Sequence, residues 1–223
     1  MEKLALSGFG GFALTGSLAL QTHLAGLGRG RDIRILNDVD LVVESFSSIP
    51  GSLADAFLFR HIHPNAPEGK MLVQFIDPEA ALRIDVFRAY GATMARSQPV
   101  CFGTSPIRVV SLEDLAARAA SLVLDLEGGQ EVPLKHAADF ERLVDAVDLG
   151  QVEIAWRDHR NNGQPATFAE ASARIRELIQ SRRELLAVPY YSQDINATCP
   201  KCENDGPFRS ASPATIHSIL GYC

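Results

Sequence analysis

Long apolar runs are missing from this sequence of 223 residues. No stretch approaches the roughly 20 consecutive apolar residues that a transmembrane helix needs. The N-terminal Met1 to Leu4 lacks the charged head, the long apolar centre and the small-residue cleavage site of a secretory signal peptide. Internal repeats and low-complexity segments are missing as well. We therefore expect a protein of the cytoplasm without a membrane partner.

Cysteine is also scarce, and the chain has no net positive charge. In a cytoplasmic chain, the four cysteines are more consistent with thiols or metal ligands than with disulfides. The formal net charge of -6 gives no global attraction for nucleic acid or an anionic membrane, although it is compatible with a local basic groove. A length of 223 residues is enough to bury a core and to form one domain, alone or with a helical annex. With 46% hydrophobic and 22% charged residues, the composition is ordinary for a soluble globular protein.

Two carboxylates stand one residue apart at the start of the apolar stretch from Asn37 to Val43. If this stretch is a β-strand, its period of two places Asp38 and Asp40 on one face and Val39 and Leu41 on the other. Neighbouring carboxylates repel each other, and an unpaired carboxylate is costly in a core. A divalent ion such as Mg²⁺, which takes oxygen ligands, would relieve both costs.

A strand, a Gly-Ser turn and a helix precede this pair. Phe12 to Thr15 predicts a short buried strand, and Ser17 to Leu24 has helical spacing with Ser17 as a candidate cap. After the break at Gly16, the helix N-terminus would present free N–H groups that can hold a phosphate, although a simple cap is the commoner case. The loop from Gly26 to Arg34 contains three arginines and forms either a solvated turn or a basic rim beside the carboxylates.

A third acidic residue interrupts an apolar pattern further along the chain. Lys70 to Ile76 predicts a strand, and Ala81 to Arg88 predicts its hairpin partner, with Asp85 in the middle. An isolated acid in a strand usually faces solvent. Next to the pair formed by Asp38 and Asp40, however, Asp85 becomes a candidate third metal ligand.

The remaining elements predict a change from alternating strands and helices to helices alone. Ser52 to Phe59 suits a helix, and Ile107 to Val110 suits a short strand. The later helices are expected over residues 111–124, 134–147, 151–160 and 167–186. This order predicts an α+β (α/β) fold, with a mixed sheet flanked by helices and then a helical C-terminal part. We expect the domains to be residues 1–110, 111–190 and a cysteine-containing tail, 191–223.

The Gly-Ser turn, the Asp-x-Asp strand and the later Asp together resemble the nucleotidyltransferase superfamily that shares the polymerase-beta-like palm. Within it, the sequence is most similar to small bacterial abortive-infection and toxin-type (type IV toxin–antitoxin) members. The stretches that carry the resemblance are Thr15–Leu20, Arg34–Leu41, Arg83–Phe87, Ser111–Leu115 and Lys135–Phe140. The family often has a lysine where this sequence has Ala119, which leaves Lys135 as the better basic candidate.

The resemblance implies a sheet of the nucleotidyltransferase type and a Mg²⁺-dependent reaction. A nucleoside monophosphate would move from an NTP such as ATP to an acceptor hydroxyl, with release of pyrophosphate. Asp38 and Asp40 would hold two Mg²⁺ ions, and Asp85 would bind the ion nearer the acceptor. Asp85 would also be placed to take the proton of the acceptor.

The nucleotide-binding residues and the partners follow from the same resemblance. Gly16 and Ser17 would bind the β- and γ-phosphates, and Arg34 and Lys135 would offset charge on the triphosphate or the acceptor. A tRNA 3′ end is the first candidate acceptor, and an antitoxin protein is a candidate partner. Small-molecule and protein acceptors, which the family also uses, stay open.

The C-terminal tail contains a separate group of candidate metal ligands. Cys199 and Cys202 form a Cys-x-x-Cys, and His217 and Cys223 lie downstream. Four such ligands predict a structural zinc site, but the last two are six residues apart, just outside the usual spacing. A reduced pair of ordinary thiols is the alternative.

Two other functions stay open at the level of sequence. A catalytically silent member of the same fold would bind nucleotide or a protein, although it has no need to keep all three carboxylates. A zinc-containing nucleic-acid-binding protein predicts a basic face, which the net charge of -6 does not support. An acidic site of the nuclease or phosphatase type fits the Gly-Ser helix start less well than NTP binding does.

Overall fold

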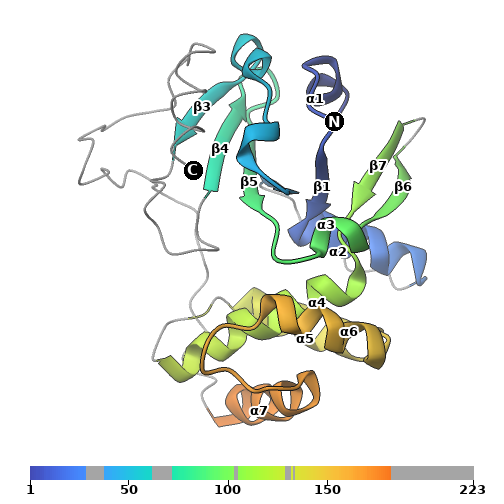
Figure 1. The fold of residues 1–223 in the computed structure, drawn as a ribbon, viewed down its shortest axis with the longest axis vertical. Coiled ribbons are helices and arrows are strands. Elements are labelled where there is room, and N and C mark those ends of the chain that lie inside the picture. The colour runs from blue at the N-terminus through green and yellow to red at the C-terminus, as the bar shows by residue number, and fades with distance from the viewer. Residues whose placement is uncertain (29–37, 62–71, 103–104, 129–131, 133, 182–223) are drawn as a thin grey trace. The chain divides into compact units, whose positions relative to one another are not determined.

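The computed structural model describes residues 1–28, 38–61, 72–102, 105–128, 132 and 134–181 (Figure 1). The chain divides into two compact units. The sheet unit contains Met1–Ala89 and Ser97–Val109, and the helical unit contains Tyr90–Arg96 and the described chain from Val110 onward. The predicted division into three domains stays a prediction.

Among the described residues, seven strands form one sheet in the order β3-β4-β5-β2-β1-β7-β6 (Figure 1). The strands are β1 (Phe12–Thr15), β2 (Asp38–Val43), β3 (Leu58–His61), β4 (Leu72–Asp77), β5 (Leu82–Arg88), β6 (Gln98–Phe102) and β7 (Ser105–Val109). β2 is parallel to β5 and β1 is parallel to β7, whereas the other neighbouring pairs are antiparallel. The predicted fold class, a mixed sheet with helices and then a helical part, is confirmed.

Short helices accompany the sheet within the same unit. They are α1 (Glu2–Leu6), α2 (Gly16–Gly26) and the 3-10 segments η1 (Phe46–Ser48) and η2 (Gly51–Asp55). α2 packs against β1 and β2. Because β1 passes directly into α2, the helix begins where Thr15 pairs with Asp40 of β2.

Apolar side chains from the central strands and from the loop before β3 form the core of the sheet unit. Leu41 of β2 and Phe75 of β4 are fully buried. The ring of Phe75 packs against the rings of Phe57 and Phe59, with centroid distances of 5.2 and 5.3 Å. This burial supplies the main favourable free energy that keeps the strands paired.

One helix predicted for this unit is wrong, and the edge strand β6 has no predicted counterpart. The helix expected over Ser52 to Phe59 is wrong: the 3-10 segment η2 is followed by strand β3, in which Leu58 pairs with Ile76 of β4. The local spacing suits a helix, but pairing with the edge of β4 and burial of Phe59 favour a strand. β6 is an additional edge strand, whose pattern is obscured by Pro99. At a sheet edge the missing N–H of a proline can face solvent.

α4 is the central helix of the helical unit. The helices are α3 (Thr93–Arg96), α4 (Leu112–Leu124), α5 (Leu134–Val144), α6 (Leu149–His159) and α7 (Phe168–Ser181), with the 3-10 turn η3 (Asp125–Gly128). α4 packs against α5, α6 and α7, and its buried small residues Ala116, Ala117 and Ala120 allow close approach. In the described parts of both units, every helix is too short or too polar to span a bilayer.

A buried ionic cluster connects α3, α4 and α6. The carboxylate of Asp114, which is 0% exposed, accepts hydrogen bonds from Arg96 Nη2 at 2.6 Å, Arg96 Nε at 2.8 Å and Ser111 Oγ at 2.6 Å. His159 Nε2 lies 2.8 Å from Asp114 Oδ1. Burial alone would raise the pKa of Asp114, but the hydrogen bonds from Arg96, His159 and Ser111 outweigh it and hold that pKa well below its usual range. Burial lowers the pKa of His159, and the hydrogen bond to Asp114 offsets this in part.

We expect the helical unit to lose stability as the pH falls below the ordinary histidine pKa of 6.5. His159 stays neutral in the folded state at a pH where the unfolded chain already takes up the proton, so the stability present above that pH is lost on acidification. One such proton changes the free energy of unfolding by at most about 1.4 kcal/mol per pH unit. Urea unfolding at a series of pH values measures it through the fluorescence of Trp156, the one tryptophan of the chain, which is buried on α6.

Two variants distinguish the contribution of His159 to this pH dependence from the contribution of the rest of the chain. His159→Gln keeps an N–H donor for Asp114 but cannot titrate, so its stability should depend less on pH between about pH 7 and 5. The control His23→Gln, on α2 of the sheet unit, should keep the wild-type dependence. Equal dependences in wild type and His159→Gln would contradict the role assigned to His159.

Candidate cation site

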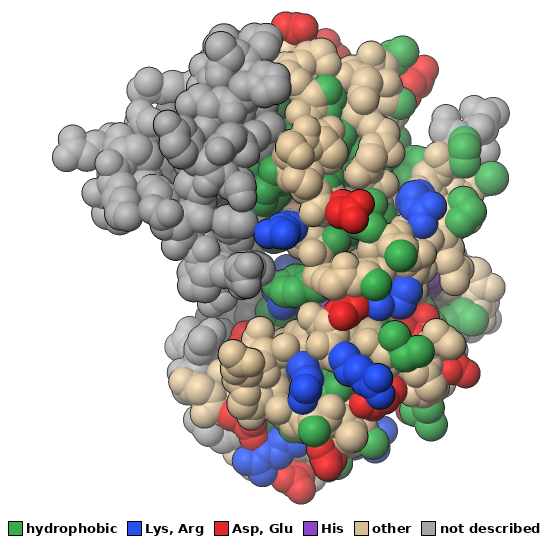
Figure 2. All heavy atoms as spheres, viewed as in Figure 1, with side chains coloured by type: hydrophobic (Ala, Val, Ile, Leu, Met, Phe, Trp, Pro, Cys, Tyr) green, Lys and Arg blue, Asp and Glu red, His purple; other side chains and the backbone are tan. Residues whose placement is uncertain are grey.

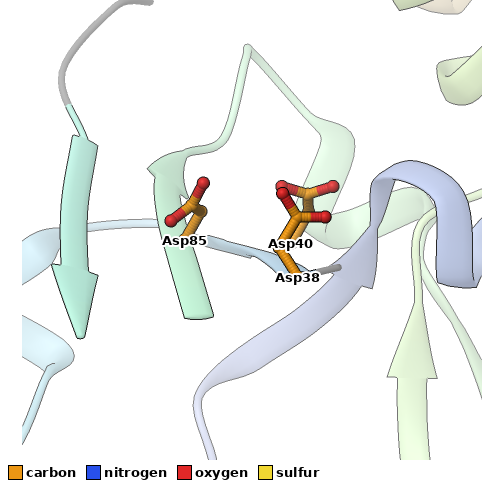
Figure 3. A group of neighbouring side chains, drawn as sticks. All are labelled: Asp38, Asp40 and Asp85. Carbon is orange, nitrogen blue, oxygen red and sulfur yellow. The ribbon is translucent and has the colours of Figure 1, made fainter. Parts of the chain in front are cut away.

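Three carboxylates converge on one face of the sheet. Alternation along β2 puts Asp38 and Asp40 on the same face, and the parallel register with β5 pairs Asp40 with Asp85. One carboxylate oxygen from each of the three lies within 4.8 Å of the other two. Figure 3 shows Asp38 and Asp40 extending from β2 and Asp85 extending from β5 toward the same side. The structure thus brings together the three residues that the sequence predicts as Mg²⁺ ligands.

The same register places the positively charged guanidinium of Arg83 among these carboxylates. Arg83 of β5 pairs with Asp38, and its Nη2 contacts Oδ2 of that residue. Arg83 Nε lies 3.4 Å from Oδ1 of Asp85, which is 6% exposed. Low exposure strengthens the repulsion between the carboxylates, because less water screens it. Three carboxylates and one guanidinium leave two formal negative charges, which one divalent cation would neutralise.

The donor set of this cluster suits a hard cation. Every ligand atom of Asp38, Asp40 and Asp85 is a carboxylate oxygen, and the group contains neither cysteine nor histidine. Carboxylate oxygens are the ligands that Mg²⁺ and Ca²⁺ prefer, whereas thiolates and imidazoles select zinc and other transition metals. The residues present therefore fit Mg²⁺.

Gly16 begins α2 directly against Asp40. Its φ is +60°, and a Cβ at this position would lie 2.0 Å from Oδ2 of Asp40, so a side chain here would displace the carboxylate. The expectation that Ser17 caps the helix is wrong, because α2 begins at Gly16 and its N-cap is Thr15. The side chain of Thr15 makes no capping hydrogen bond. The first turn of α2, with the positive end of the helix dipole, therefore lies beside the acidic cluster.

The other predicted site residues belong to the helical unit or fall outside the described residues. Lys135 is exposed in the first turn of α5, in the helical unit, and its nucleotide-binding role stays a prediction. The predicted residues outside the described part of the chain are Arg34 and the candidate zinc ligands Cys199, Cys202, His217 and Cys223.

Two neighbours of the cluster are absent from the sequence prediction. Arg83 stands two residues before Asp85, so the period of a strand alone places both on one face. Gln74 of β4 pairs with Asp85 from the other side and is 1% exposed. Its position depends on the register of the β4–β5 hairpin, which the local pattern does not specify.

Comparison with known proteins finds a likeness among solved structures. No family model and no curated protein matches the sequence. The antibiotic-resistance factor ANT(2'')-Ia matches with 12% identity and a TM-score of 0.47, covering 82% of this chain and 92% of that chain. A candidate nucleotidyltransferase from H. pylori matches with 14% identity and a TM-score of 0.29, covering 82% and 95%.

A second protein from Helicobacter pylori, JHP933, matches with 13% identity and a TM-score of 0.31, covering 82% of this chain and 94% of that chain. All three TM-scores are below 0.5 and all identities are below 15%. At these values, the likenesses establish neither the family nor the activity of this chain.

We expect Gly16→Ala to destabilise the sheet unit. A residue other than glycine at this positive φ costs about 1–2 kcal/mol, and the contact with Asp40 adds to that cost. The free energy of unfolding should fall by about 1–3 kcal/mol, measured by urea unfolding with circular dichroism. Gly10→Ala is the matched control, since Gly10 has no positive φ and a Cβ there would meet no described residue within 4 Å beyond its chain neighbours. Equal losses in the two variants would contradict the close approach of Gly16 to Asp40.

Proposed function

We propose that this protein is a divalent-cation-dependent nucleotidyltransferase, which moves a nucleoside monophosphate from an NTP to an acceptor hydroxyl and releases pyrophosphate. The observation that carries the proposal is the cluster of Asp38, Asp40 and Asp85, with oxygens within 4.8 Å, beside the start of α2. The cluster fits a hard cation, and the helix terminus fits a phosphate group. Phosphoryl-type transfer requires this combination of positioning and charge neutralisation rather than covalent catalysis by the protein.

The order of the strands supports binding of the two substrates on opposite sides of the acidic cluster. β1 and α2 adjoin Asp40 on one side of the cluster, and β4 adjoins Asp85 on the other. On this proposal, the triphosphate lies next to α2, where Gly16 allows a close approach to the backbone and Ser17 stands in the first turn. The acceptor hydroxyl then approaches from the side of Asp85.

The proposed reaction exchanges one P–O bond for another and transfers one proton. The acceptor oxygen attacks the α-phosphorus, the bond from this phosphorus to the oxygen bridging the β-phosphate breaks, and pyrophosphate leaves. Asp38, Asp40 and Asp85 would hold and orient the cation, and Asp85 would also accept the proton of the acceptor hydroxyl. When bound, the divalent cation supplies Lewis-acid activation of the hydroxyl and offsets the charge of the leaving pyrophosphate.

The identity of the substrates and partners rests on the sequence resemblance. On that basis we propose Mg²⁺ as the cation, ATP as a candidate nucleotide, a tRNA 3′ end as the acceptor and an antitoxin protein as a partner. Arg34 and Lys135 would offset charge on these ligands. On the face that Figure 2 shows, Lys and Arg side chains intermingle with Asp and Glu over the helical unit, so the described residues there form no uniformly basic surface for RNA.

Isothermal titration of each of the four NTPs in the presence of Mg²⁺ tests the proposal. The wild-type protein should bind at least one NTP with micromolar affinity, and removal of Mg²⁺ by a chelator should abolish this binding. Asp40→Asn removes one charge from the cluster with little change of shape. Its affinity for the NTP with Mg²⁺ should therefore fall by roughly tenfold or more.

Asp55→Asn is the matched control, because Asp55 is an exposed aspartate of η2 in the same unit. It should bind the NTP as tightly as the wild type does. Folded wild-type protein that binds no NTP with Mg²⁺ would contradict the proposal. Undiminished binding by Asp40→Asn would contradict the role of the acidic cluster.

A further inference from the structure

Gln74 of β4 occupies the sheet position next to Asp85. The antiparallel register of β4 and β5 pairs Gln74 with Asp85, and the parallel register of β2 and β5 pairs Asp40 with Asp85 from the other side. Residues paired directly across neighbouring strands point to the same face of a sheet. Asp40, Asp85 and Gln74 therefore form one row across three strands, on the face that carries the acidic cluster.

The side chain of Gln74 is buried more deeply than its apolar neighbours. Gln74 is 1% exposed, whereas Leu72 and Ile76, on the same face of the same strand, are only half-buried. Its amide oxygen Oε1 is buried and has no hydrogen-bond partner among the described residues. Such an oxygen is unfavourable in a folded protein, because it has lost its water without a replacement. A ligand of the acidic face would supply the missing partner.

A cation is the ligand that best fits this amide oxygen. Amide and carboxylate oxygens together surround hard divalent cations in proteins. A neutral oxygen also adds a donor without adding to the repulsion among the three carboxylates. A hydroxyl of the acceptor substrate is the other chemical possibility, and a measurement with the cation alone distinguishes the two.

We propose that the Oε1 atom of Gln74 is a fourth oxygen donor for the hydrated divalent cation held by Asp38, Asp40 and Asp85. This inference rests on the proposed function, because it requires that cation. It assigns to β4 a part in the site that would otherwise be made by β2 and β5. The two strands next to β5 would then both supply ligands to the cation, Asp40 from β2 and Gln74 from β4.

Mn²⁺ without nucleotide is the probe for this proposal, with free Mn²⁺ measured by electron paramagnetic resonance. Gln74→Met has a similar length and no amide, so its affinity for Mn²⁺ should be weaker by roughly tenfold or more. Gln74→Asn keeps an amide but withdraws its oxygen by one methylene, and it should show a loss as well. Gln74→Glu keeps an oxygen and adds charge, so it should bind Mn²⁺ at least as tightly as the wild type does.

Thermal unfolding in a chelator separates cation binding from a structural role. Without a cation, Gln74→Met should melt at or above the wild-type temperature, because it leaves no oxygen without a partner. In the chelator, Gln74→Glu should have a lower melting temperature than the wild type. Addition of Mn²⁺ should raise the melting temperature of Gln74→Glu by more than it raises that of the wild type. A Gln74→Met variant that is destabilised in the chelator and binds Mn²⁺ normally would show that the amide is structural.

Two controls distinguish failure of this proposal from failure of the proposed function. Gln98→Met, at an exposed position on β6, should bind Mn²⁺ as the wild type does. If Asp40→Asn loses Mn²⁺ while the Gln74→Met and Gln74→Asn variants keep wild-type affinity, the proposal for Gln74 is overturned and the cation site stands. If the wild type binds no Mn²⁺, or if Asp40→Asn binds it normally, both proposals fail.

Discussion

Repulsion among Asp38, Asp40 and Asp85 is the constraint on which the rest of the site depends. The parallel register of β2 and β5 forces the carboxylates together, and the buried apolar core keeps these strands paired despite the cost. The ion pairs from Arg83 to Asp38 and Asp85 offset one of the three negative charges. The two charges that remain would attract a divalent cation to this face of the sheet.

Two uncharged residues stand on opposite sides of this charged cluster. Gly16 gives α2 room to begin against Asp40, because a Cβ there would lie 2.0 Å from its carboxylate. Gln74 presents a buried amide oxygen in the strand beyond Asp85. The proposed mechanism uses this sequence of groups across the sheet: helix N-terminus for the phosphates, carboxylates for the cation, and Asp85 with its β4 neighbour toward the acceptor.

Local patterns in the sequence predict some of these groups and not others, for physical reasons. Asp38 and Asp40 share a face because of the period of a single strand, and the apolar residues that follow predict that strand. Asp85 is recognisable as an acid within an apolar strand, but its approach to Asp40 depends on a parallel pairing between strands far apart in the chain. The contact of Gly16 and the burial of Gln74 depend on helix entry and on hairpin register, which short-range periodicity does not encode.

The same distinction applies to the fold. Helices are expected over residues 111–124, 134–147, 151–160 and 167–186, and α4 to α7 confirm them over the described residues. β3 and β6 instead become strands because a partner strand offers its hydrogen-bonding edge. The bonds among Asp114, Arg96 and His159 also join parts of the chain that have no local signal in common.

The most direct test of the proposed cation site is a crystal structure with Mn²⁺ and a non-hydrolysable NTP, examined by anomalous scattering at the manganese edge. We predict a manganese peak bound by oxygens of Asp38, Asp40 and Asp85, with the triphosphate against the start of α2. We also predict that the guanidinium of Arg83 moves away from Asp38 as the cation takes its place. A triphosphate bound elsewhere, with Arg83 still between the carboxylates and no manganese beside them, would contradict the proposed site.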